Sequence, residues 1–128
     1  MEYKLTINGV HFHPWAVENG IQIYPVYRNY REVTTLNGAL YNTYVARWHI
    51  DFASVEISHD TLRSLLVAVQ PTMYARVLPA VYTDPRGTGG ATIAANVVLV
   101  SPPTYEVSRV IGGRTYYRNL TFSLEDKY

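Results

Sequence analysis

The chain has 128 residues and a mass of 14.5 kDa, so we expect a single domain over residues 1–128. Hydrophobic residues make up 48% and charged residues 16%, which excludes a disordered or highly charged chain. The net charge of +1 argues against broad electrostatic capture of nucleic acid or of an acidic membrane. The absence of cysteine excludes disulfide scaffolds, zinc ribbons, iron–sulfur clusters and thiol nucleophiles.

The start of the chain differs from a targeting segment. Residues 1–7 alternate polar and apolar side chains, whereas a signal peptide has a continuous apolar segment. No run of about eighteen apolar residues occurs, so we expect no transmembrane helix and no membrane insertion. The twelve tyrosines favour a β-rich binding or assembly module, because tyrosine combines β propensity with an amphipathic side chain.

Apolar residues near the start of the chain recur with period two, which is the spacing of a strand with one buried face. The first strand is expected over residues 3–7 and ends at a turn formed by Asn8 and Gly9. Residues 10–15 resume the pattern until a proline interrupts it. A second short strand is expected to start around residue 21, and Pro25 confines it to an edge or an end of the sheet.

The strongest turn signal is the pair Asn37 and Gly38, because both residues adopt the positive φ of a type I′ hairpin at low cost. We expect the flanking segments 31–36 and 39–44 to be antiparallel partners. The following segment, 45–55, alternates strongly and predicts a strand with one core face and one polar face. The core face contains Ala46, Trp48, Ile50 and Phe52, and the polar face contains Arg47, His49 and Asp51.

One segment, about residues 58–70, has helical spacing. Its apolar residues fall at i, i+3, i+4 and i+7 and form one stripe, which consists of Leu62, Leu65, Leu66 and Val69. Ser58 is a suitable N-cap, Asp60 lies favourably in the first turn, and Pro71 ends the helix. The pattern predicts an α-helix that lays its apolar stripe on a sheet.

Two long strands are expected after the helix, over residues 73–82 and 91–100. The glycine-rich segment between them, residues 84–90, lacks the lysine and the Ser or Thr of a P-loop and joins two strands. We interpret this segment as a mobile hairpin tip that is disordered until it meets a partner.

The last part of the chain predicts another hairpin. Pro102 and Pro103 are expected to break the chain, after which residues 105–111 pair with residues 114–124 through a Gly–Gly turn. Alternation places five side chains of the second arm on one face: Tyr116, Arg118, Leu120, Phe122 and Leu124. The order of strands, one helix and strands predicts a mainly β fold, either an antiparallel β-sandwich or a partly closed barrel with one packed α-helix.

Few residues form a pattern suited to catalysis or metal binding. His11 and His13 would share a strand face and supply half of a metal site, but no local argument brings further ligands to them. Asp51 and Glu56 have an odd separation that places their carboxylates on opposite faces, and Asp51 suits pairing with a cross-strand arginine. The serines lack a Gly-x-Ser-x-Gly motif. We therefore expect no catalytic residue, no metal and no cofactor.

Two clusters interleave aromatic and basic residues. One contains Tyr24, Tyr27, Arg28, Tyr30 and Arg31, and the other contains Arg114, Tyr116, Tyr117 and Arg118. Such surfaces form protein interfaces, in which Tyr and Arg are common hot-spot residues, or stack on bases and sugar rings. The near-zero net charge favours an interface over a plain β surface, a nucleic-acid site or a glycan site. The predicted interface residues are Tyr27, Arg28, Tyr30, Arg31, Arg86, Tyr116, Tyr117 and Arg118.

Several ordered segments carry a resemblance to a known family. They are YKLTINGV at 3–10, VYRN at 26–29, VTTLNG at 33–38, GGRTYY at 112–117 and FSLE at 122–125. Together they resemble small proteins encoded in the tail gene clusters of prophages and tailed phages of gut Firmicutes, and the likeness covers most of the chain. These motifs are turns and strand ends and contain no catalytic signature.

The resemblance implies a virion structural protein of the tail or baseplate, similar to distal-tail and tail-tube modules that form rings, commonly sixfold, around the DNA channel. It implies a homo-oligomer with other phage tail proteins as partners, found in the virion and, during assembly, in the host cytoplasm. It implies no recognition of a specific nucleic-acid sequence. A chain of 128 residues has no room for the carbohydrate-binding or arm domain of many distal tail proteins, which argues against receptor contact.

A ring repeats a heterologous interface, so each subunit must present two different complementary surfaces. Long hairpins such as residues 73–100 are expected to extend a neighbour's sheet through backbone hydrogen bonds. The open alternative is a stand-alone module that binds a glycan or a single-stranded nucleic acid through the same Tyr and Arg clusters.

Overall fold

The computed structural model describes the backbone of residues 3–34, 40–70 and 77–127, and the side chains of these residues outside 27–46 and 127. The chain is mainly β with one α-helix, as expected. In chain order, the elements are β1 (Leu5–Ile7), β2 (Val10–His11), the 3₁₀-helix η1 (His13–Trp15), β3 (Ala16–Thr34), β4 (Leu40–Ser54), β5 (Ile57–Ser58), α1 (His59–Val69), β6 (Leu78–Thr83), β7 (Thr92–Ile111) and β8 (Arg114–Lys127).

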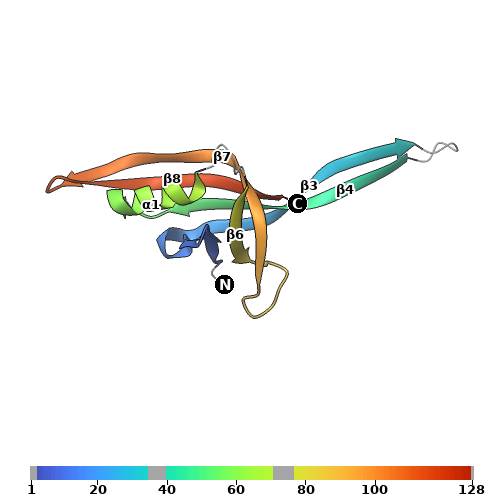
Figure 1. Ribbon diagram of the computed structural model, residues 1–128, viewed down its shortest axis with the longest axis horizontal. Helices are drawn as coiled ribbons and strands as arrows, with labels where there is room; N and C mark the ends of the chain where they lie inside the picture. The colour runs from blue at the N-terminus through green and yellow to red at the C-terminus, as the bar shows by residue number, and fades with distance from the viewer. Residues whose placement is uncertain (1–2, 35–39, 71–76, 128) are drawn as a thin grey trace.

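The strands form one antiparallel sheet that curls into a half-barrel (Figure 1). The strand order is β2-β1-β6-β7-β8-β4-β3, and β5 pairs with β8 off this path. Every neighbouring pair is antiparallel. Because there is one curled sheet, the fold matches the partly closed barrel that the sequence predicts and not the two-sheet sandwich.

The N-terminal strands are short. The turn from β1 to β2 is made by Asn8 and Gly9, which both have positive φ as a tight turn requires. Residues 10–15 resume the strand only for the two residues of β2, and η1 follows. The strand expected to start near residue 21 is far longer, because Pro25 is tolerated on β3, the strand at the end of the sheet.

β3 and β4 are antiparallel partners, as the turn signal predicts, and the predicted turn residues Asn37 and Gly38 lie outside the described residues. The alternation of the segment 45–55 is confirmed where side chains are described. Ile50 and Phe52 are buried, whereas the side chains on the opposite face of β4 are only partly buried.

β7 runs without a break, so the expectation that Pro102 and Pro103 interrupt the chain is wrong. The pairing of β7 with β8 shifts register between Leu99 and Ser101 and again between Ser101 and Thr104. Both prolines lie within these irregularities, where no regular ladder hydrogen bond requires the N–H that proline lacks. The strand therefore bends around the prolines and continues.

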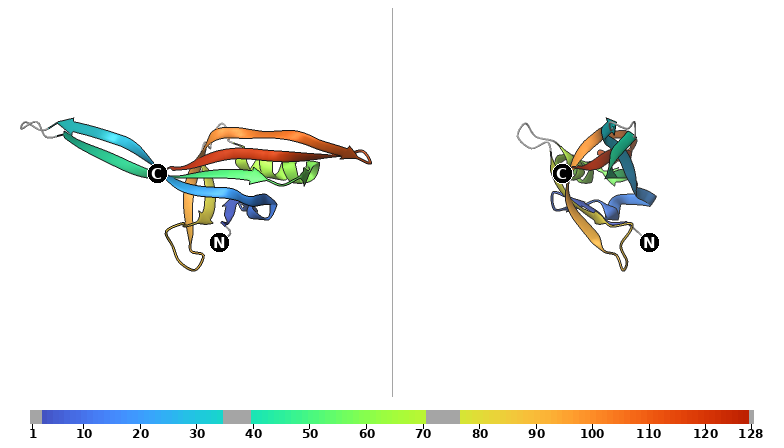
Figure 2. Two further views of the ribbon diagram at one scale, coloured as in Figure 1. Left: turned by 180° about the vertical axis from the view of Figure 1, so that it is seen from behind. Right: turned by 90° about the vertical axis from the view of Figure 1, so that its right-hand side faces the viewer.

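Two long hairpins project from the body in opposite directions (Figures 1 and 2). β7 and β8 pair out to Ile111 and Arg114 at one end of the molecule. At the other end, β3 and β4 pair out to Thr34 and Leu40, far beyond the last residue of β4 that pairs with β8. We call this second hairpin, residues 25–34 and 40–48, the β3–β4 arm.

The helix covers the body of the sheet and contacts β5 and β8 (Figure 1). Ser58 is the N-cap, as expected, and its hydroxyl accepts a hydrogen bond from the backbone N–H of Thr61. At the other end, the side-chain amide of Asn8 donates to the carbonyl of Ala68 over 2.7 Å. The buried stripe consists of Leu62, Leu65, Ala68 and Val69, with Leu66 partly buried.

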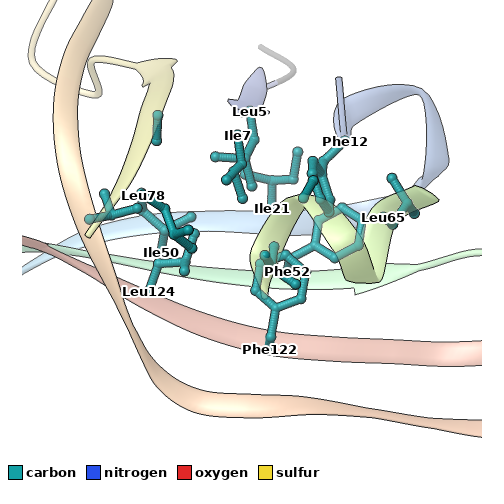
Figure 3. Packing of buried hydrophobic residues seen from close by; sticks show 14 of the residues in the cluster. Leu5, Ile7, Phe12, Ile21, Ile50, Phe52, Leu65, Leu78, Phe122 and Leu124 are labelled. Atoms are coloured by element: carbon teal, nitrogen blue, oxygen red, sulfur yellow. The ribbon is translucent and has the colours of Figure 1, made fainter. Parts of the chain in front are cut away.

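The core lies between α1, the inner face of the half-barrel and the segment that links β2 to η1 (Figure 3). Phe12 from this link is fully buried and meets Phe52 and Phe122 edge-on, with ring centroids 5.4 Å and 5.6 Å apart. Phe52 and Phe122 stack on each other at 5.1 Å across β4 and β8. These three rings join the N-terminal segment to the centre of the sheet.

Candidate assembly interface

Apart from short β2 and the β4 side of the β3–β4 arm, the curled sheet has two long strand edges with no partner strand among the described residues. Within the described ranges 3–34, 40–70 and 77–127, residues 99–111 of β7 pair only with β8, and β3 pairs only with β4. An unpaired edge presents backbone N–H and C=O groups that can pair with a strand of another chain. We call residues 104–111 of β7 the β7 edge.

The β7 edge is rich in exposed apolar side chains. Tyr105, Val107, Val110 and Ile111 have exposed fractions of 47%, 56%, 64% and 52%. Single apolar side chains are common on protein surfaces, but an exposed run along one unpaired strand is typical of a surface that pairs with another chain. The sequence-based prediction omits these residues because it rests on two clusters that interleave Tyr with Arg, and residues 105–111 lie outside both clusters. The sequence signal was the apolar content of both faces of residues 107–111.

A groove with a volume of about 940 Å³ runs along the other edge, beside residues 16–24 of β3. Tyr3, Lys4 and His13 also line it. We call this feature the β3 groove. Its walls combine backbone of an open strand with both apolar and polar side chains, an arrangement suited to an extended peptide segment.

The structure separates the predicted residues of the β7–β8 hairpin. Tyr117 turns toward the helix: its ring meets Tyr105 edge-on at 5.5 Å, and its hydroxyl lies 3.4 Å from Nδ1 of His59. Arg118 is exposed and its Nε donates to Glu106 over 2.7 Å. The expectation that Arg118 shares a face with Leu120 and the later apolar residues is therefore wrong.

The cause is a local change in the backbone of β8. Asn119 has a φ of 55°, in the left-handed region, and this residue shifts the alternation of side chains along the strand. After Asn119, Leu120, Phe122 and Leu124 point into the core, as expected. Before it, Tyr117 packs against the core and Tyr116 does not.

Tyr116 belongs to a polar network on the exposed face of the hairpin. The guanidinium of Arg109 lies 5.4 Å from the centre of the Tyr116 ring and donates to Glu56 over 2.9 Å. The hydroxyl of Ser108 donates to the same carboxylate over 2.6 Å. The hydrogen bond from Ser108, followed by those from Arg109 and its charge, lowers the pKa of Glu56 below its usual value.

Five predicted interface residues remain. The side chain of one of them, Arg86, is described, and the side chains of the other four are not. Arg86 lies in the glycine-rich loop, and its guanidinium stacks over the ring of Trp48 at 4.9 Å. The loop also closes on itself, since the backbone N–H of Asp84 donates to the carbonyl of Ala91. Its expected ordering on assembly stays a prediction. The side chains of Tyr27, Arg28, Tyr30 and Arg31 lie outside the described side chains, although their backbone belongs to the β3–β4 arm.

Asp51 lies at the centre of a polar cluster on the outer face of the sheet. Its carboxylate accepts hydrogen bonds from the hydroxyls of Ser123 and Tyr24, and Nε2 of His49 lies 3.1 Å from it. Burial disfavours the charged form of Asp51, but the hydrogen bonds from Ser123 and Tyr24 and the proximity of His49 outweigh it and lower its pKa. The hydrogen bond to Asp51 in turn raises the pKa of Tyr24.

This cluster differs from the expected pairing of Asp51 with an arginine, and it also differs from a catalytic triad. In a triad, the histidine lies between the serine and the carboxylate and removes the serine proton. Here Ser123 and His49 both contact Asp51 itself, and the Ser123 hydroxyl donates a hydrogen bond to the Asp51 carboxylate. The histidine therefore does not lie between the serine and the carboxylate. The arrangement stabilises three neighbouring strands.

His11 and His13 do lie close together, with ring centroids 5.2 Å apart. Nδ1 of His11 lies 2.8 Å from the hydroxyl of Thr6, and Nδ1 of His13 lies 3.3 Å from the carbonyl of Leu5. Among the described residues, no group of three or more His, Cys, Asp or Glu side chains could hold a metal ion. His11 ends β2 and His13 begins η1, so the two residues do not share a strand face as expected.

Two further observations bear on the class of protein. No helix in the described ranges 3–34, 40–70 and 77–127 is long and apolar enough to cross a membrane. The chain matches no known family, no curated protein and no solved structure. In the part of the chain that the structure describes, the fold and the site define an open antiparallel half-barrel with one α-helix, two projecting hairpins and free edges along β3 and β7.

Proposed function

We propose that this chain is a structural assembly subunit without catalysis, which joins copies of itself or partner proteins through the free edges of its sheet. The observation that carries the proposal is the pair of free edges on one sheet, one with exposed apolar side chains and the other beside a groove. Strand addition at such edges is a common mode of protein association. Two different surfaces on one subunit are what a heterologous, ring-forming contact requires.

The β3–β4 arm supports the same proposal. It is a two-stranded ribbon that extends past the last residue of β4 paired with β8 (Figure 1). An isolated two-stranded ribbon is marginally stable in water, because it buries little surface and has two unpaired edges. A long ribbon of this kind gains most when a partner covers it, and this supports association rather than a solitary role.

The biological setting of the proposal is a phage tail or baseplate. It rests on the resemblance of the turn and strand-end motifs to small tail proteins, and on the suitability of a two-edged sheet for a ring around an axis. In this setting the subunit works in the virion after assembly in the host cytoplasm, and its partners are copies of itself and other tail proteins.

Native mass spectrometry and sedimentation over a range of protein concentrations test the proposal. We expect discrete oligomers, alone or with purified tail proteins, whose stability changes little between about 0.1 M and about 1 M salt, because the seam is mostly backbone hydrogen bonds and apolar contacts. A protein that stays monomeric under all of these conditions contradicts the proposal. Binding of a single-stranded oligonucleotide that weakens steeply with salt would favour the alternative binding module instead.

A further inference from the structure

The two free edges of the sheet are complementary in shape and in chemistry. We propose that copies of this chain join head to tail, with the β7 edge of one copy lying antiparallel in the β3 groove of the next. The inference rests on the proposed function and deepens it, because it names the partner as a second copy and assigns the two surfaces that meet.

Strand direction supports this pairing. β7, β8, β4 and β3 are successive neighbours in the sheet, and every pair is antiparallel. Three reversals make β7 and β3 run in opposite directions within one molecule. A second copy that is rotated about an axis along the strands and also shifted along it keeps these directions, so its β3 meets the first copy's β7 as an antiparallel partner. The shift is needed because Gln22 is level with Ser101 across the sheet, whereas the β7 edge begins at Thr104. This is the pairing with hydrogen bonds perpendicular to the strands.

The shapes of the two edges also favour a contact between unlike edges. The β7 edge belongs to a hairpin that projects from the body (Figure 1), whereas a groove runs along β3. Two β7 edges would bring two projecting ridges together, and two β3 grooves would leave a hollow between the copies. A projecting strand of one copy fits the groove of the other, and such a contact between unlike surfaces repeats from copy to copy.

The side chains match this arrangement. Val107 and Val110 of the β7 edge are mostly exposed, and Val17 and Tyr24 beside the β3 groove are 37% and 39% exposed. Contact between these residues removes apolar surface from water on both copies, which favours association. The groove also has exposed polar side chains, such as that of Gln22. In the proposed contact they would form the polar rim that commonly surrounds the apolar centre of an interface. The chemistry therefore suits a second copy of this chain.

A charge placed on the β7 edge tests the inference. In Val110→Lys, the lysine disfavours strand pairing at the edge, so we expect self-association to weaken by about tenfold or more. Val67→Lys on α1 is the matched control, because Val67 and Val110 are 62% and 64% exposed in the free chain. The control should associate as the unmodified chain does, in sedimentation at matched concentrations, and circular dichroism should show both variants folded.

Thiol crosslinking tests which edges meet, because the chain has no cysteine of its own. In the double variant with Gln22→Cys and Val107→Cys, a short bismaleimide crosslinker should produce a ladder of covalent dimers, trimers and larger species. Each single variant should give little crosslinking. Efficient covalent dimers of Val107→Cys alone would show that two β7 edges meet, and this would overturn the inference.

The failure of this inference differs from the failure of the proposed function. A chain that assembles normally as Val110→Lys, and gives no ladder in the double variant, overturns the head-to-tail pairing and leaves the assembly role intact. A chain that never associates with itself also overturns the pairing. If that chain fails to join tail proteins as well, the proposed function is overturned with it.

Discussion

At the scale of single residues, Asp51 shows how a polar side chain ties the outer face of the sheet together. Its carboxylate contacts side chains from three strands: Tyr24 on β3, His49 on β4 and Ser123 on β8. Hydrogen bonds to a charged group are stronger than those between neutral groups, and partial exposure of Asp51 reduces their net value. The cluster thus fixes the register of β3 and β8 on β4.

We expect Asp51→Asn to destabilise the fold at neutral pH by about 1 kcal/mol, after discounting for solvent screening. The pKa of Asp51 is lowered in the folded protein, so its stabilising effect is full above the pKa of the unfolded chain and is lost as pH falls through the folded pKa. Urea unfolding at neutral pH and near pH 3 should show a difference that shrinks with acidity. An unchanged difference at both pH values would contradict this assignment.

Tyr24→Phe is the matched variant for this cluster. It removes one donor to Asp51 and keeps the ring that lies 5.0 Å from the ring of His49. We expect a smaller loss of stability than in Asp51→Asn, because the hydrogen bond from Ser123 remains. An equal or larger loss in Tyr24→Phe would mean that the ring position, and not the carboxylate, controls this face.

At the scale of elements, the pairing of β3 with β4 is irregular near the start of β3. The pairing of the two strands shifts register between Ala16 and Ile21, and Gly20 lies inside this irregularity and is buried. A Cβ atom on Gly20 would lie 2.4 Å from the carbonyl oxygen of Ala53 and 2.8 Å from Val17. Glycine therefore permits the close approach of the two backbones that shapes the wall of the β3 groove.

We expect Gly20→Ala to destabilise the fold by about 1–3 kcal/mol, because the added carbon meets backbone that cannot easily move. Gln22→Ala, an exposed change on the same strand, should stay within about 0.5 kcal/mol of the unmodified chain. Midpoints of urea unfolding measure both. Equal stability of Gly20→Ala and Gln22→Ala would show that the irregular pairing of β3 adapts to a side chain.

At the scale of the whole molecule, one core holds together segments far apart in the chain. The three phenylalanine rings join the link after β2 to β4 and β8 (Figure 3), and the same cluster includes residues from α1 and β6. The hairpins extend outward from this core. The body therefore carries the stability, while the hairpin edges remain available for contacts with other chains.

We expect Phe12→Ala to cost about 3–5 kcal/mol, because it opens a cavity at a fully buried site. A domain of this size has about 5–15 kcal/mol in total, so the variant should be close to its unfolding threshold. Denaturation followed by fluorescence and circular dichroism should give one shared transition at a much lower midpoint. Val67→Ala, at an exposed helix position, is the control and should change little.

Much of the fold follows from local sequence patterns. The spacing of leucines and the Ser58 cap predict α1, and the alternation around Ile50 predicts the buried face of β4. The length of β7 and the faces of β8 were predicted wrongly. Both errors have the same physical origin: Pro102, Pro103 and Asn119 lie at irregularities that a regular alternation does not represent.

The candidate interface was only partly predictable. The sequence indicates exposed aromatic and basic residues, but it places Tyr117 on the surface, whereas the structure packs it between Tyr105 and His59. Whether an apolar residue of a strand is exposed depends on which strand or helix covers it. For Val107 and Val110, this is decided by the end of the pairing between β6 and β7.

By itself, the amino-acid sequence determined the β-rich class, the antiparallel hairpins and the single helix, because strand alternation, glycine turns and helix capping act over a few neighbouring residues. Only the tertiary structure decided that the sheet curls into a half-barrel, that two of its edges stay open and that a groove follows one of them. These features depend on contacts between residues far apart in the chain, and such contacts leave no local pattern in the sequence.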